Sequence, residues 1–197
     1  MEKPKFVGVY VDCCLTWRPH IQYIQGKIAR SLGILSKARK FFNGDTLLTL
    51  YYSFLHPYLS YCIEIWGNTF TTYLDPLKKL QNRAVRMITG IARRKSVSSY
   101  YKELKILPLN KLYMYIIQLF MYKWQHVKLP TMFDSFFKKN YEISRRDTRQ
   151  SCLLHIPDGF LKIQRRNIKF NCVRLHNYLY VRLCFKCSIQ TYKYKLK

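Results

Sequence analysis

Apolar residues recur every three or four positions between residues 45 and 66, which is the spacing of a helix. Leu47, Tyr51 and Trp66 belong to this pattern, and the polar residues fall on one narrow stripe between them. A helix that is apolar around most of its circumference is normally buried, so the pattern predicts a central helix surrounded by other elements. Pro57 lacks a backbone N–H and predicts a kink or a split near the middle of that helix.

A transmembrane helix is the alternative interpretation of this segment, because roughly 20 mostly apolar residues can span a bilayer. His56, Pro57 and Glu64 lie inside the segment, however, and a glutamate is costly at any depth in hydrocarbon. Basic residues flank both ends, so no charge asymmetry favours one orientation. We therefore expect a buried helix and no membrane partner.

Three further helices are predicted around the central one. The first covers Pro19–Lys40, the second begins at Asp75–Pro76 and ends at Gly90, and the third covers Asn110–Val127. A short helix is also expected at Tyr100–Leu104. The residues expected to face the core are Ile21, Ile24, Ile28, Leu32 and Leu35 in the first helix, Leu77, Leu80, Ala84 and Ile88 in the second, and Leu112, Ile116, Leu119 or Phe120, and Trp124 in the third.

The two ends of the chain carry other patterns. Lys5–Val11 is β-branched and aromatic and predicts a strand, with a turn at residues 12–14 and a short return over Leu15–Trp17. Beyond about residue 140, short segments predict weak strands or irregular structure: Ser151–Ile156, Leu161–Gln164 and Asn167–Cys172, before a terminal helix near Lys186–Leu196. We thus expect a mainly α protein, in which a short N-terminal β-hairpin (residues 1–17) precedes a helical bundle (18–130) and an irregular α+β segment (131–197).

Charge changes the picture more than any other feature of the composition. The 197 residues include 35 Lys and Arg against 10 Asp and Glu, a formal net charge of +25, and 49% are hydrophobic. A chain with this share of hydrophobic residues can bury a core and is not a disordered basic tail. Its charge favours a polyanionic partner, and nucleic acid is the commonest one. An anionic membrane and a merely basic fold are the alternatives.

Basic side chains recur at helical spacing opposite the apolar stripes, and a basic loop follows at residues 92–98. Such a surface can follow a phosphate backbone, with contacts mainly to phosphate and sugar. The alternative is that these are ordinary solvated helix faces, but few acids are present to balance them. The candidate nucleic-acid-binding residues are Lys27, Arg30, Lys37, Lys40, Lys79, Arg83, Arg86, Arg93, Arg94 and Lys95.

Neither a metal site nor a catalytic group is predicted. Cys184 and Cys187 form a lone C-x-x-C that could be combined with other Cys and His residues, but the spacings match no standard zinc finger. Nucleotidyl transfer by two metal ions needs clustered carboxylates, and the ten acids are spread singly. The chain opens without a leader-like apolar stretch, and its seven cysteines show no disulfide framework. We expect an intracellular protein, nuclear or cytoplasmic, that is not secreted.

Several stretches taken together resemble the reverse transcriptases of LINE-type (non-LTR) retrotransposons, in particular jockey-like elements. Lys5–Asp12, Leu15–Trp17 and His20–Ile21 resemble the segment that ends the palm of these enzymes. Leu50–Gly67 and Leu77–Gly90 resemble their helical thumb. Residues 147–151 and 154–157 match a stretch common near the C-terminus of the family.

The resemblance implies roles for these stretches. The hairpin residues Phe6, Val7, Gly8, Val9 and Tyr10 would grip the primer end, and residues 19–90 would hold an RNA/DNA template–primer duplex. The family binds catalytic Mg²⁺ through paired aspartates of the palm, and no counterpart of that pair occurs here. We therefore expect a truncated reading frame, inactive alone and without a cofactor of its own. The alternative is a stand-alone basic helical nucleic-acid-binding protein with no enzymatic activity.

Overall fold

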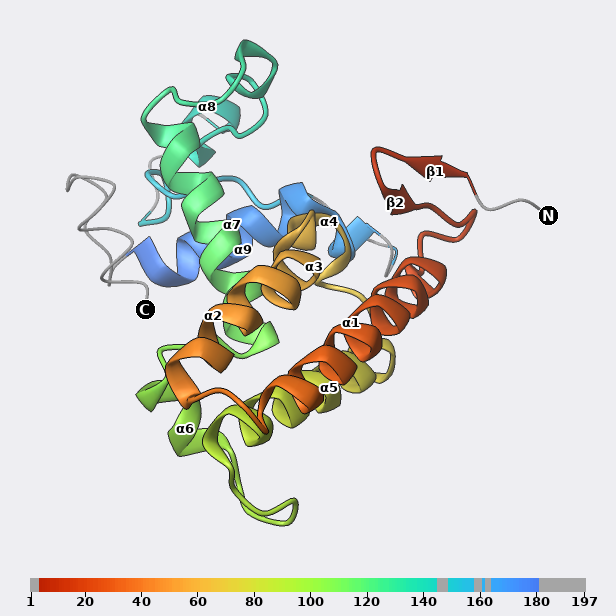
Figure 1. Ribbon diagram of the computed structural model, residues 1–197. Coiled ribbons are helices and arrows are strands. Elements are labelled where there is room, and N and C mark those ends of the chain that lie inside the picture. Colours follow the sequence, from red (N-terminus) through yellow and green to blue (C-terminus); the bar gives the residue numbers. More distant parts are fainter. Residues whose placement is uncertain (1–3, 145–148, 158–160, 162–163, 181–197) are drawn as a thin grey trace. The chain divides into compact units, whose positions relative to one another are not determined.

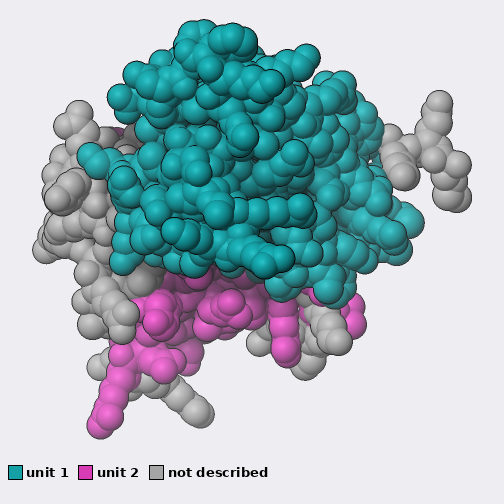
Figure 2. All heavy atoms as spheres, turned by 60° about the horizontal axis from the view of Figure 1, so that its bottom comes forward, with its two compact units in different colours: residues 1–113 teal, residues 114–197 magenta. Residues whose placement is uncertain are grey.

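The computed structural model describes residues 4–144, 149–157, 161 and 164–180, and these residues are mainly helical (Figure 1). The chain divides into two compact units, residues 1–113 and residues 114–197 (Figure 2). The predicted fold class, mainly α with a short N-terminal hairpin, is confirmed. In the described part of the chain, no helix is long and apolar enough to cross a membrane.

The first unit opens with a two-stranded antiparallel hairpin, β1 (Lys5–Phe6) and β2 (Val9–Tyr10). The prediction of one strand over Lys5–Val11 is therefore wrong. Val7 and Gly8 have φ values of 45° and 81°, so the chain reverses between the two strands. The predicted return strand over Leu15–Trp17 is also absent, because this segment is a loop held by side-chain bonds to Asp12.

Two long helices, α1 (Arg18–Ala38) and α5 (Thr71–Thr89), lie side by side and run in the same direction (Figure 1). At their beginnings, the Thr69 hydroxyl donates to the Thr16 carbonyl at 2.7 Å. At their ends, a Cβ on Gly44 would lie 3.7 Å from the Ile88 carbonyl oxygen. Most of the residues predicted to face the core are buried: Ile21, Ile24, Ile28, Leu32 and Leu35 in α1, and Leu77, Ala84 and Ile88 in α5.

Helix α5 ends as predicted and begins earlier than predicted. Gly90 caps its C-terminus in the left-handed conformation, with a φ of 70°. The helix begins at Thr71 rather than at Asp75, so Pro76 lies inside it and one backbone hydrogen bond is lost. Asp75 pairs instead with Lys78, at 3.1 Å.

The central segment is three short helices, α2 (Gly44–Phe54), α3 (His56–Ser60) and α4 (Ile63–Trp66). Helix α2 ends at Phe54 and α3 begins at His56, so a split near Pro57, one of the two predicted outcomes, is confirmed. Pro57 has no backbone N–H with which to continue the helical hydrogen bonds of α2. A second break, which the pattern did not predict, lies at Cys62, whose φ is 50°.

Burial of the central segment is narrower than predicted. One stripe is buried, formed by Leu47, Tyr51, Leu55, Leu59, Ile63 and Trp66. Four other large side chains are at least two-fifths exposed: Tyr52, Phe54, Tyr61 and Ile65. The segment thus covers one side of α1 and α5 and is not surrounded.

A buried amide ties the first unit together. Gln81 of α5 is 1% exposed, and its Nε2 donates to the Tyr51 hydroxyl at 3.0 Å and to the Leu107 carbonyl at 2.9 Å. Its Oε1 accepts from the N–H of Leu109 at 3.0 Å. Three elements therefore share one satisfied polar group in the core.

Helices α6 (Ser98–Glu103) and α7 (Leu109–Gln125) lie close to their predicted positions. The buried side of α7 differs in part from the prediction. Leu112 is buried as expected, whereas Ile117 and Met121 are fully buried in place of the residues predicted there. The predicted residues that are only partly buried are Ile116, Leu119, Phe120 and Trp124. Helix α7 runs from the first unit into the second.

The described part of the second unit continues with η1 (Thr131–Phe133), α8 (Asn140–Ile143), η2 (Gln164–Arg166) and α9 (Ile168–Tyr180). The prediction of a weak strand or irregular structure over Asn167–Cys172 is wrong, because α9 begins at Ile168. Leu154 forms an isolated bridge with Lys139, and its N–H and carbonyl both bond the Asn177 side chain. The helix predicted near residues 186–196 lies outside the described residues.

Candidate nucleic-acid interface

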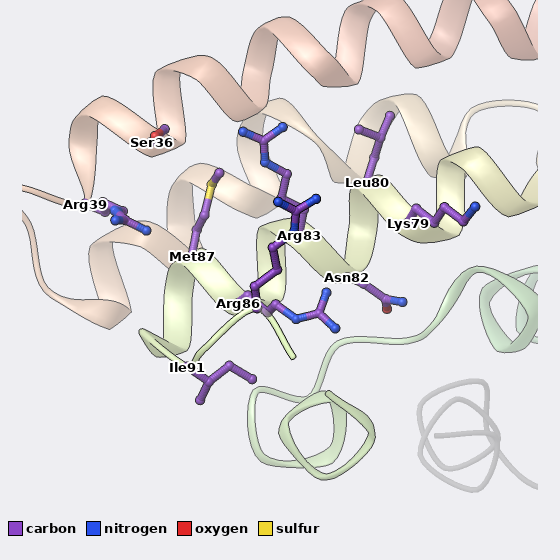
Figure 3. A pocket seen from close by; sticks show the side chains of 10 residues that line it. Ser36, Arg39, Lys79, Leu80, Asn82, Arg83, Arg86, Met87 and Ile91 are labelled. Atoms are coloured by element: carbon purple, nitrogen blue, oxygen red, sulfur yellow. The ribbon is translucent and has the colours of Figure 1, made fainter. Parts of the chain in front are cut away.

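An open groove of about 830 Å³ lies between the C-terminal part of α1 and one face of α5 (Figure 3). Of the described residues, five basic ones line it: Arg39, Lys79, Arg83, Arg86 and Arg93. The remaining lining residues are the polar Ser36 and Asn82 and the apolar Leu80, Met87 and Ile91. No acidic side chain is among them, so the groove is a concave surface of one charge sign.

Helix periodicity explains how α5 contributes three of these cations. Lys79, Arg83 and Arg86 are spaced four and three residues apart, which places them on one face of the helix. The opposite face is apolar and is buried against the rest of the unit. The basic groove is therefore the outward side of an amphipathic helix.

Arg86 also holds the following loop in place. Its Nη2 donates to the carbonyl oxygen of Lys95 at 3.2 Å, and the loop itself turns through a bond from the Lys95 N–H to the Ala92 carbonyl. The positive guanidinium in the last turn of α5 also complements the negative end of the helix dipole. Arg86 thus combines a structural role with a place in the groove, and it brings Arg93 to the same surface.

The structure gathers four of the ten predicted binding residues: Lys79, Arg83, Arg86 and Arg93 line the groove. The other six do not line it. Lys27 lies over the ring of Tyr23, 5.4 Å from its centroid, and the Nε of Arg30 donates to the Gly26 carbonyl at 3.3 Å. The remaining four are exposed and lie near the C-terminal ends of α1 and α5: Lys37, Lys40, Arg94 and Lys95. A role in binding remains a prediction for all ten.

Arg39 is a groove residue that the sequence reasoning missed. The basic stripe on the first helix was traced at helical spacing, and Arg39 lies between two of its members, directly after the last residue of α1. Its backbone is still helical, with φ −59° and ψ −16°, so Arg39 lies on the same side of the helix as the groove residue Ser36, three positions earlier. The available signal was its place among Lys37, Arg39 and Lys40, which is a local run of cations.

The predicted primer-gripping hairpin is exposed at its tip. Phe6 is 74% exposed and Val7 67%, and Gly8 is exposed between the strands. The second strand packs on the helical part instead: Val9 is buried, and Tyr10 contacts Tyr23 edge to face, with ring centroids 5.0 Å apart.

The Tyr61 ring fixes the turn of this hairpin. Its hydroxyl donates to the Val7 carbonyl at 2.7 Å, and a Cβ on Gly8 would lie 3.5 Å from its Cε1. The close approach to Gly8 is therefore made by a side chain. The function of the five hairpin residues remains a prediction.

Among the described residues, no group of three or more His, Cys, Asp or Glu side chains could hold a metal ion. Cys152 is exposed and Cys172 is buried. The C-x-x-C at Cys184 and Cys187 lies outside the described residues.

Comparison with known proteins finds a partial relationship to reverse transcriptases. The chain is 28% identical over 106 residues to the probable RNA-directed DNA polymerase from transposon X-element of Drosophila melanogaster; this match covers 52% of the chain. It is 30% identical over 89 residues, 44% of the chain, to the RNA-directed DNA polymerase from mobile element jockey of Drosophila funebris. The matched stretches are 12% and 10% of those two proteins, so the chain spans only about a tenth of their length.

The resemblance to reverse transcriptases of non-LTR retrotransposons is thus confirmed as a distant, partial similarity. No protein-family model matches the chain. No solved structure matches it either.

Proposed function

We propose that the chain is a thumb-like, nucleic-acid-binding part of a non-LTR retrotransposon reverse transcriptase, and that it holds an RNA–DNA template–primer duplex by the phosphate backbone. The observation that carries the proposal is the groove, where basic side chains of α1, α5 and the following loop come together without an acid. The partial similarity to two RNA-directed DNA polymerases supports the same class of partner.

The composition of the groove suits phosphate. Four of its five cations are arginines, and a guanidinium matches the phosphate oxygens with two parallel hydrogen bonds. Contacts of this kind do not read base sequence, so binding is sequence-independent. Asn82 and Ser36 add neutral donors that can reach the sugar–phosphate backbone on the same surface.

The proposed contribution is to binding and not to the chemical step. Phosphoryl transfer by this family depends on Mg²⁺ held by paired aspartates of the palm, and the acids of this chain occur singly in the sequence. The chain would therefore act as the duplex-holding surface next to a palm that supplies the metal ligands.

The test is the affinity of the full chain for a short fluorescein-labelled RNA–DNA duplex, measured by fluorescence anisotropy. Replacing Arg39 and Arg83 with Ala removes two charges from the groove, and we expect about tenfold weaker binding from two lost charge-assisted contacts. The matched control is K102A/K111A, which removes the same charge from exposed residues outside the groove. We expect the control to change the affinity less than about twofold. An equal loss in both double variants would mean that net charge alone drives binding, and the proposal would be wrong.

A further inference from the structure

Two phenylalanines between α1 and α2 are unusually exposed. Phe41 is 81% and Phe42 54% exposed, although both side chains are large and apolar. A pair of large aromatic side chains exposed to solvent marks a surface that binds another molecule.

The backbone around this pair is well fixed. The N–H groups of Phe41 and Phe42 both donate to the Ala38 carbonyl at 3.0 Å, which continues the turn of α1. On the other side, the Asn43 side chain accepts from the Thr46 N–H at 3.0 Å and caps α2. The two rings are therefore presented by a short, ordered connection and do not belong to a loose loop.

This connection lies at the end of the basic groove. Arg39, which lines the groove, is within one helical turn of both rings. Gly44, at the other end of the connection, lies against the Ile88 carbonyl in the last turn of α5, where Arg86 and Met87 also line the groove. The exposed rings and the groove cations thus share one end of the α1–α5 pair.

The chemistry around the rings favours one kind of partner. Lys37, Arg39 and Lys40 precede them directly, and no acid occurs from residue 37 to residue 42. Aromatic rings next to a row of cations form the surface on which proteins bind single-stranded nucleic acid, with bases on the rings and phosphates on the cations. Bases inside a duplex already stack on each other and cannot use such rings. An apolar protein segment would gain nothing from the three cations.

We propose that Phe41 and Phe42 stack unpaired bases of a single-stranded stretch that adjoins the duplex held in the groove. The inference rests on the proposed function, because the groove would place the duplex end next to the rings. It adds a second class of substrate contact: the rings bind bases of an overhang, and the groove binds phosphates of the duplex.

The experiment uses four labelled probes with the full chain: a blunt RNA–DNA duplex, the same duplex with a single-stranded overhang at one end, the same duplex with the overhang at the other end, and the overhang strand alone. We expect the wild-type chain to bind one overhang probe more tightly than the blunt duplex. The F41A/F42A variant should lose that preference, about tenfold for one or two unstacked bases, and should bind the blunt duplex as the wild type does. F41W/F42W should keep the preference.

The control is I34A/F54A, which removes two other exposed apolar side chains of the same unit, 50% and 43% exposed. It should leave the affinities for all four probes unchanged. An F41A/F42A variant that keeps the overhang preference would overturn the inference, and so would one that loses affinity for the blunt duplex to the same extent. Self-association of the wild type that F41A/F42A abolishes, measured by sedimentation velocity, would assign the rings to a second copy and also overturn it. If the wild type failed to bind the blunt duplex, the proposed function would fail, whereas ring-dependent binding of the single strand would still be measured separately.

Discussion

His20 shows how much one residue depends on its surroundings. It follows the hairpin in sequence, is 2% exposed, and accepts from the Tyr10 N–H through Nδ1 at 3.4 Å. Its ring contacts Trp66 edge to face, with centroids 5.9 Å apart. Burial lowers the pKa of His20 from 6.5 to about 4, so the imidazole is neutral at neutral pH.

This burial makes the folded state sensitive to acid. An unfolded His20 binds a proton below its ordinary pKa of 6.5, whereas the folded one binds a proton only near pH 4. Protonation therefore favours the unfolded state, and stability present above pH 6.5 is lost as the pH falls to 4. A shift of this size corresponds to at most about 3 kcal/mol.

The H20N variant tests whether His20 causes this acid sensitivity, because Asn keeps an acceptor for the Tyr10 N–H and does not titrate. We expect H20N to be less stable than the wild type at neutral pH, by about 1–3 kcal/mol for the lost ring contacts. Its free energy of unfolding in urea should fall less steeply with acid. His176, whose pKa burial also lowers to about 4, contributes equally to both proteins. Parallel pH profiles of the two proteins would show that His20 is not the source.

At the scale of elements, two glycines in helices have opposite effects on stability. Gly90 ends α5 with a φ of 70°, where a Cβ is strained. Gly26 lies within α1, where a Cβ would meet nothing within 4 Å. The first is a structural requirement of the helix end, and the second only adds conformational entropy to the unfolded chain.

Alanine at these two positions should therefore act in opposite directions. We expect G90A to destabilise the chain by about 1 kcal/mol through strain at the end of α5. G26A should stabilise it by about 0.5–1 kcal/mol, because Ala is the better helix former. Urea denaturation of both variants measures the change. Stabilisation by G90A would contradict the assigned role of Gly90, and destabilisation by G26A would show a constraint on α1 that the geometry does not contain.

At the scale of the whole molecule, the net charge of +25 concerns partners more than folding. Lys78–Asp75 is the one ion pair between residues that the structure describes. With 35 basic and 10 acidic residues, the acids can neutralise only part of the positive charge. A bound nucleic acid can neutralise more of it, and each neutralised phosphate releases counterions.

The salt dependence of binding follows from this. The logarithm of the association constant for the RNA–DNA duplex should fall linearly with the logarithm of salt concentration, with a slope of about −4.5 if all groove cations contact phosphate. The R39A/R83A variant should reduce the slope by about 2, and K102A/K111A should leave it nearly unchanged. An anisotropy titration at several salt concentrations measures both. A flat dependence in the wild type would exclude phosphate contacts as the source of affinity.

The sequence by itself determined the elements whose signals are local. The buried stripe of α1, the outward cations of α5, the end of α5 at Gly90 and the split before Pro57 follow from residue spacing and from backbone limits of single residues. Three groove cations, Lys79, Arg83 and Arg86, were predicted from helical spacing, and Arg93 was predicted from the basic run at residues 92–98.

The tertiary structure alone decided the features that depend on distant residues. The hairpin turn at Val7 and Gly8 is fixed by a bond from Tyr61, 54 residues away in sequence. Arg39 joins the groove, and Phe41 and Phe42 stay exposed beside it, because α1 ends where the last turn of α5 lies. Spacing along the chain carries no information about such neighbours, since they are set by how the helices pack.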